Sequence, residues 1–223
     1  ASLAEEVLGI DVDHSDALLL RAGTRLNRGE IDGAISDLRL LLHNRPDFEP
    51  AILLQAQVSA LKGETEVAES QWRKVLEINP NNLAALIPVL NQLARRGDYD
   101  EAEGGLSRAD EAIQNKPGML ELLIQLKVQK KDWEGAKLVI EKLRAVTQAN
   151  LPAKYWEGFL LVRQGQSLEA EKIYQGILAV TPEHLETLVA LSQLYESSRR
   201  RVDLIDYLKR FTAKNPALGS ALD

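Results

Sequence analysis

A spacing of 34 residues recurs along almost the whole chain, and it limits the possible folds more than any other feature. Small residues mark this spacing five times in succession: Ala34, Ala68, Ala102, Ala136 and Ala170. The sixth member of the series is Leu204. A fixed period of about 20 to 50 residues is the signature of repeat proteins, in which each unit buries its apolar face against its neighbours. The sequence therefore predicts a stack of similar units.

Two further positions recur in step with the small residues and predict how each unit is built. Five residues earlier lies a position suited to a tight turn, occupied by Gly29, Gly63, Gly97, Lys131, Gly165 and Arg199. Twelve residues later lies a position that ends a helix, occupied by Pro46, Pro80, Gln114, Gln148, Pro182 and Pro216. Glycine adopts positive φ without strain, and proline stops a helix because it has no amide hydrogen. Between these marks, apolar residues three to four apart, such as Leu18, Ala22 and Leu26, favour two helices per unit.

These positions divide the chain, taken as a single domain of residues 1–223, into consecutive segments. The segments are 1–14, the second helix of a truncated unit, and the six units 15–48, 49–82, 83–116, 117–150, 151–184 and 185–218. Ala22, Ala56 and Gly158 are expected where two helices cross closely, because a larger side chain would hold the axes apart. Two equivalent positions of the second helices are expected in the core: Leu38, Trp72, Leu106, Ile140, Tyr174 and Leu208, then Leu41, Val75, Ala109, Leu143, Ile177 and Phe211.

The unit length and its pattern of small, aromatic and proline positions resemble those of the tetratricopeptide repeat, or TPR, family. The resemblance covers nearly the whole chain, and the segment GDYDEA, residues 97–102, is close to the usual turn of that family. It implies an all-α fold, a right-handed α-solenoid (superhelix) of about six TPR helix-turn-helix repeats. It also implies a scaffold that binds other proteins and is not an enzyme.

The resemblance further implies which side chains face the concave groove, since in this family the first helix of each repeat lines it. The inward positions are the second, fifth, ninth, twelfth and thirteenth of a repeat. Transferred to this chain, they give the expected partner-binding residues: Asn91, Arg95, Gln125, Gln129, Tyr155, Phe159, Arg163 and Gln193, with Trp156 and Glu196 beside them. Aromatic and arginine side chains supply most hot spots, and amides suit an extended peptide backbone. Alternatively, Tyr155, Trp156 and Phe159 only pack against neighbouring helices.

Two narrower groups within the TPR family are also similar to parts of this sequence. TPR cochaperones that grip a C-terminal carboxylate carry Lys at the fifth and Asn at the ninth position of one repeat. Asn91 is at a ninth position, but the fifth is Ile87, so that type of site is disfavoured. Runs such as KDWEGAKLVIEKLRA, residues 131–145, are similar to long bacterial TPR proteins of exopolysaccharide export and envelope assembly.

Charge and composition argue against several other classes of protein. Lys and Arg total 27 against 33 Asp and Glu, and a net charge of -6 provides no basic surface for nucleic acid. Cysteine is absent, and His43 has no second histidine at zinc-site spacing, so no metal is expected. His14 and His184 occupy the same turn position as Asn82, which explains them as turn residues. No cofactor is expected, because the glycines do not cluster into a phosphate-binding loop.

The same residues bear on catalysis and on location. Acidic side chains on exposed helices more often form solvated faces than acid and base pairs, so catalysis is not expected. No apolar run approaches the roughly 18 to 20 residues that span a bilayer. We expect a soluble segment without a membrane span of its own, for which the cytoplasm and the bacterial periplasm fit equally well.

Several irregularities leave alternatives open. The segment 1–14 and the residues from Ala217 onward resemble parts of further repeats, which indicates a longer solenoid or ends that pair in another way. Gly104 and Gly105 lie in a predicted helix and mark either a tolerated irregularity or a change of curvature. Arg199 to Arg201 are either part of a degenerate repeat or an anion-binding patch or docking site for an acidic partner.

The leading hypothesis is a scaffold that holds a peptide or helix of a partner protein in the groove of repeats three to six. A second hypothesis is a structural spacer, or a module that self-associates through its open ends. A third is the recruiting arm of an exopolysaccharide-export or other envelope-assembly system whose other parts lie outside this sequence.

Overall fold

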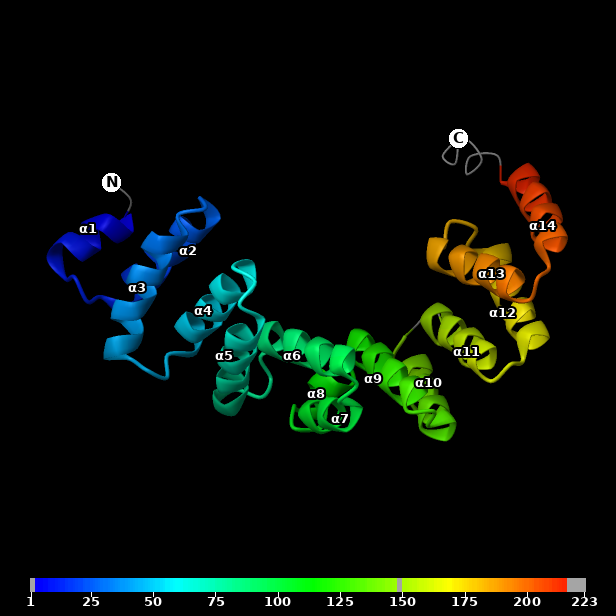
Figure 1. The fold of residues 1–223 in the computed structure, drawn as a ribbon, viewed down its shortest axis with the longest axis horizontal. Coiled ribbons are helices and arrows are strands. Elements are labelled where there is room, and N and C mark those ends of the chain that lie inside the picture. The colour runs from blue at the N-terminus through cyan, green and yellow to red at the C-terminus, as the bar shows by residue number, and fades with distance from the viewer. Residues whose placement is uncertain (1–2, 148–149, 216–223) are drawn as a thin grey trace. The chain divides into compact units, whose positions relative to one another are not determined.

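The computed structural model describes residues 3–147 and 150–215. This described part contains fourteen helices and no strand, so the all-α prediction is confirmed. The helices belong to two compact units, Ala1–Ile113 and Gln114–Asp223, which are described separately (Figure 1). None of the described helices is long and apolar enough to cross a membrane.

The first unit contains α1 (Leu3–Ile10) and three helical hairpins (Figure 1). The hairpins pair α2 (Ser15–Asn27) with α3 (Ile31–Asn44), α4 (Glu49–Leu61) with α5 (Thr65–Ile78), and α6 (Leu83–Arg96) with α7 (Tyr99–Ser107). From α1 to α7, each helix packs against the next one along the chain. The short α8 (Glu111–Gln114) lies at the boundary between the units.

The second unit contains three more hairpins (Figure 1). They pair α9 (Pro117–Gln129) with α10 (Trp133–Val146), α11 (Leu151–Arg163) with α12 (Ser167–Val180), and α13 (Leu185–Ser197) with α14 (Arg201–Lys214). α11 packs against α9 and α13 as well as against its own partner. The first helices of the three hairpins therefore form one layer, and this layer positions the candidate site.

All six residues at the predicted turn position have a left-handed backbone. The φ angle is 77° at Gly29, 76° at Gly63, 84° at Gly97 and 78° at Gly165, and it is also positive at Lys131 (59°) and Arg199 (57°). The amide after each of these residues donates back into the preceding helix, as Asp132 N does to Lys127 O at 2.9 Å. The turn therefore keeps its geometry where glycine is missing, at a strain of about 1 kcal/mol for each non-glycine residue.

The predicted role of the two turn histidines is confirmed by the hydrogen bonds at the starts of their helices. The Nδ1 atoms of His14 and His184 accept from the amides of Ala17 and Thr187 at 3.3 and 3.2 Å. The side-chain oxygen of Asn82 accepts from the amide of Ala85 at 3.1 Å in the same way. All three side chains satisfy an amide that the first turn of a helix leaves unpaired.

The core contains the small and the large side chains at the positions that the repeat predicts. The five alanines of the series are fully buried, and Leu204 is 8% exposed. At Gly158, a methyl group would lie 2.6 Å from Cε1 of Tyr174, so only glycine fits where α11 crosses α12. The large residues expected in the core are buried except Leu208, which is partly exposed on α14.

The third hairpin departs from the others at its second helix. α7 has 9 residues, whereas α5 has 14. Gly104 and Gly105 lie near the end of α7, where they contribute no side-chain packing and weaken the helix. Beyond it, the amide of Asp110 donates to the side-chain oxygen of Asn81 at 2.7 Å instead of continuing the helix. The irregularity expected at the two glycines is therefore an early helix end.

Candidate functional site

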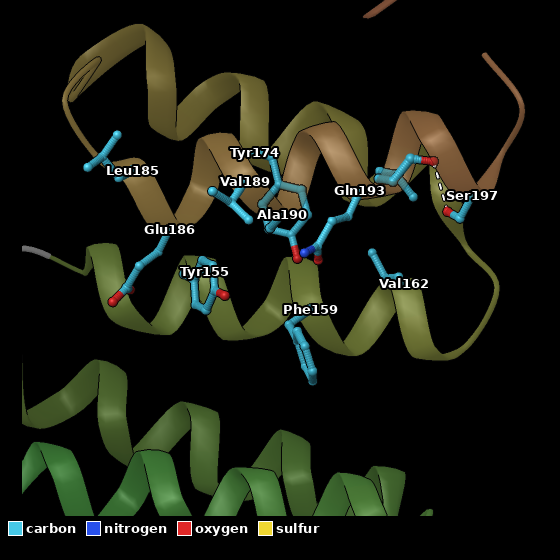
Figure 2. Close-up of a pocket in the computed structure, with 11 residues that line it drawn as sticks. Tyr155, Phe159, Val162, Tyr174, Leu185, Glu186, Val189, Ala190, Gln193 and Ser197 are labelled. Carbon is cyan, nitrogen blue, oxygen red and sulfur yellow. Dashed lines mark hydrogen bonds between the residues drawn. The ribbon is translucent and has the colours of Figure 1, made fainter. Parts of the chain in front are cut away.

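A groove of about 560 Å³ lies between α11 and α13 of the second unit (Figure 2). Its lining combines aromatic, aliphatic and polar side chains: Tyr155, Phe159, Val162, Tyr174, Leu185, Glu186, Val189, Ala190, Gln193, Leu194 and Ser197. α11 and α13 are the first helices of successive hairpins. The groove therefore lies on the layer of first helices, which the resemblance to TPR proteins implies to be the inward face.

Aromatic rings form one side of this groove. The Tyr155 ring lies 6.0 Å from that of Tyr174 and 5.6 Å from that of Trp156, measured between centroids. Tyr174 is 1% exposed and Trp156 7% exposed, whereas Tyr155 and Phe159 are only partly buried. Trp156 is therefore a core residue, as one of the two alternatives predicted, while Tyr155 and Phe159 both pack on the core and line the groove.

The Tyr155 side chain lies in an environment that favours its neutral hydroxyl form. Burial raises its pKa above the ordinary value, and the negative charges of Glu186 and Glu121 raise it further. Within the described part of the chain, the hydroxyl has no hydrogen-bond partner. It is therefore able to donate a hydrogen bond to a bound molecule.

A second, smaller hollow of about 250 Å³ adjoins the groove. Its lining comes from α9, α11 and the start of α13: Glu121, Gln125, Pro152, Tyr155, Trp156, His184 and Glu186. It shares Tyr155 and Glu186 with the groove. The two hollows therefore extend one surface across three successive first helices.

The structure brings together half of the eight residues predicted from the sequence. Gln125, Tyr155, Phe159 and Gln193 line the two hollows. Gln129 and Arg163 are exposed on the same helices but outside the lining, and the guanidinium of Arg163 lies 5.5 Å from the Phe159 ring centre. Asn91 and Arg95 are exposed on α6 in the first unit.

Sequence reasoning missed several lining residues although the repeat positions contained them. Glu186 and Val189 occupy the second and fifth positions of the sixth repeat, and Glu121 occupies the fifth position of the fourth. The resemblance implies that these positions face inward, but aliphatic side chains and the carboxylates Glu121 and Glu186 were not among the expected contacts. Leu185 lies at the first position of its repeat, so the inward positions do not include it, and the exposure of Leu185 (64%) and Val189 (53%) is known only from the structure.

Of the three consecutive arginines, Arg200 is engaged within the protein, while Arg199 and Arg201 are exposed. Arg199 is the left-handed turn residue. The guanidinium of Arg200 pairs with Glu171 at 2.5 Å and Asp203 at 2.6 Å, and it lies 4.9 Å from the Tyr195 ring centre. Its charge is therefore compensated within the protein.

The stacked helical hairpins define the class of this protein as an α-helical repeat protein, or α-solenoid. No model of a known protein family matches the sequence, and no curated protein matches it. Solved structures do match, and their similarity shows that the fold is that of the tetratricopeptide repeat proteins.

Three of these structures illustrate the likeness. A tetratricopeptide repeat protein from Parabacteroides merdae has a TM-score of 0.76 at 13% identity, with 89% of this chain and 79% of the other covered. YrrB, described as a TPR protein with an unusual peptide-binding site, has a TM-score of 0.67 at 14% identity, covering 85% and 97%. PilF of Pseudomonas aeruginosa has a TM-score of 0.60 at 21% identity, covering 93% and 94%.

Proposed function

We propose that this chain is a protein-binding scaffold and that the surface formed by α9, α11 and α13 holds a segment of a partner protein. The observation that carries the proposal is the pair of adjoining hollows, which expose one side of Tyr155 and Phe159 between aliphatic and amide side chains. Partly exposed aromatic anchors in a concave surface are typical of binding hot spots. YrrB, which has the same fold, is described as having a peptide-binding site, and this supports the proposal.

Gln125, Tyr155, Phe159 and Gln193 are the proposed contacts within the hollows. Gln129 and Arg163 extend the same face beyond the lining. Asn91 and Arg95, on the exposed surface of α6, remain proposed contacts for the first unit.

The test is affinity capture from an extract of the source cells. The protein is compared with a Tyr155→Ala, Phe159→Ala, Arg163→Glu variant whose helicity is checked by circular dichroism. A second variant, Arg163→Glu with Gln193→Ala, changes only exposed side chains and leaves the core intact. Proteins captured by the wild type and lost from both variants support the proposal.

The matched control is Lys172→Glu, which makes the same charge change on the exposed face of α12. It is expected to capture the same proteins as the wild type. If the groove variants also capture them unchanged, binding does not use this surface and the proposal is wrong.

A second candidate function, self-association, is favoured by apolar side chains on the first helix. Leu3 and Ile10 of α1 are 72% and 92% exposed. Exposed apolar side chains that gather on one helix favour pairing with a second copy. Sedimentation over a wide concentration range tests this, and a monomer at every concentration would exclude it.

A further inference from the structure

The two hollows that meet at Tyr155 differ in chemistry. The groove between α11 and α13 is walled by the aliphatic side chains of Val162, Leu185 and Val189. The smaller hollow contains two carboxylates, Glu121 from α9 and Glu186 from α13. An apolar compartment thus lies next to an acidic one, and Tyr155 and Glu186 belong to both.

The two carboxylates are not neutralised by the protein. Among the described residues, neither Glu121 nor Glu186 forms an ion pair, whereas Glu157 pairs with Arg144 at 3.0 Å and Glu171 with Arg200 at 2.5 Å in the same unit. Neither hollow is lined by a lysine or an arginine. His184 lines the smaller hollow, but its Nδ1 atom faces the amide of Thr187 at the helix start.

The Tyr155 ring adds a second feature that attracts positive charge. The ring is partly exposed between the two hollows, and Figure 2 shows Glu186 reaching from α13 toward the side of α11 that carries Tyr155. An ammonium or guanidinium group near an aromatic face is stabilised by the quadrupole of the ring. Burial is the main cause of the raised pKa of the Tyr155 hydroxyl, and the negative charges of Glu186 and Glu121 add to it.

We propose that this surface selects a partner segment in which a lysine or arginine lies next to a bulky apolar residue. The cationic head binds Glu121 and Glu186 beside the Tyr155 ring, and the apolar side chain enters the groove beside Leu185 and Val189. The inference rests on the proposed function, because it assigns the chemistry of the partner at the same surface. An acidic segment is excluded by repulsion from the two carboxylates, and a wholly apolar one would remove them from water without compensation.

The test is a selection from a phage-displayed library of random peptides against the whole protein. The wild type is expected to enrich peptides with Lys or Arg beside a bulky apolar residue. Glu121→Gln with Glu186→Gln is expected to lose this bias and to bind a synthetic enriched peptide about tenfold more weakly. Added salt is expected to weaken the wild-type complex, because the contact is partly exposed.

The control is Glu169→Gln with Glu183→Gln, which removes the same charge at exposed positions of this unit outside both hollows. It is expected to leave the bias and the affinity unchanged. Three results overturn the inference: enriched peptides without a basic residue, a bias that survives in the Glu121→Gln, Glu186→Gln variant, or no enrichment. If peptides without a basic residue are lost on Tyr155→Ala, the proposed function still stands; if no peptide depends on Tyr155, both fail.

Discussion

Lys131 and Arg199 hold a backbone conformation that glycine holds at the other four hairpin turns. Their φ angles of 59° and 57° bring the β-carbon close to the following carbonyl, which strains an L-residue. At these two positions, backbone strain could be relieved by a single substitution to glycine.

Replacing Lys131 by glycine is expected to raise the free energy of unfolding by about 0.5 to 1 kcal/mol. The relief of strain exceeds the entropy that a glycine adds to the unfolded chain. Urea denaturation followed by circular dichroism measures the change. The reverse substitution, Gly97→Lys, is expected to lower the stability by a similar amount, and equal stability of all three proteins would refute the strain argument.

Glu69 is a buried carboxylate that the sequence did not single out. It is 7% exposed, and Arg96 and Arg73 donate to it at 2.8 to 2.9 Å. These hydrogen bonds, Arg96 first, hold the pKa of Glu69 below its ordinary value of 4.5 despite the opposing effect of burial. The expectation that acidic residues lie mainly on solvated faces does not hold at Glu69. Arg73 follows it by four residues on the same helix, a spacing visible in the sequence, but Arg96 comes from α6 and no sequence spacing reveals that contact.

The lowered pKa of Glu69 gives a stability that depends on pH. Its contribution is complete above pH 4.5 and is lost as the pH falls through the lowered folded-state value. Glu69→Gln is expected to cost about 1 to 2 kcal/mol at neutral pH and to flatten the loss of stability in acid. Chemical denaturation at several pH values measures both effects, with Glu66→Gln on the exposed face of α5 as control. A parallel pH profile in the Glu69 variant would contradict the assignment.

At the scale of the helices, substitutions at two glycines distinguish helix propensity from helix packing, because one glycine has free space around it and the other does not. A methyl group at Gly104 in α7 meets nothing within 4 Å, while one at Gly158 in α11 meets Tyr174 at 2.6 Å. Gly104→Ala is expected to stabilise by about 0.5 to 1 kcal/mol, and Gly158→Ala to destabilise by about 1 to 3 kcal/mol. Thermal melts of the two variants measure this, and a shift of the same sign in both would show that helix propensity outweighs the crossing.

The positions of the helices followed from the sequence far better than the end of α7 did. Turn residues and buried alanines determine structure in their own repeat and recur every 34 residues, so each prediction is supported by the same pattern in the other repeats. The two glycines indicated an irregularity in α7 but not where the helix ends, and the contact between Asn81 and Asp110 beyond that end joins residues 29 apart in the sequence. The candidate site was predicted only in part for a similar reason. The resemblance to TPR proteins implies the inward positions, but which of them border a hollow depends on the packing of neighbouring helices.

At the scale of the molecule, all proposed contacts within the two hollows lie in one compact unit. The second unit has its own core, which includes Leu143, Tyr174 and Leu191. A fragment of residues 114–223 is therefore expected to be helical and to bind a peptide selected on the whole chain within about threefold of the same Kd. Circular dichroism and fluorescence anisotropy measure the two properties. A folded fragment that does not bind would place essential contacts in the first unit.

The left-handed turns have a consequence for how such chains diverge. Four turns carry glycine, while lysine and arginine hold the same backbone at the other two. The turn glycine of a repeat can therefore be replaced in one repeat at a time, because neighbouring repeats stabilise the fold and each replacement costs only about 1 kcal/mol. The sequence of the repeats can then diverge until it no longer resembles that of other repeat proteins, while the arrangement of helical hairpins stays the same.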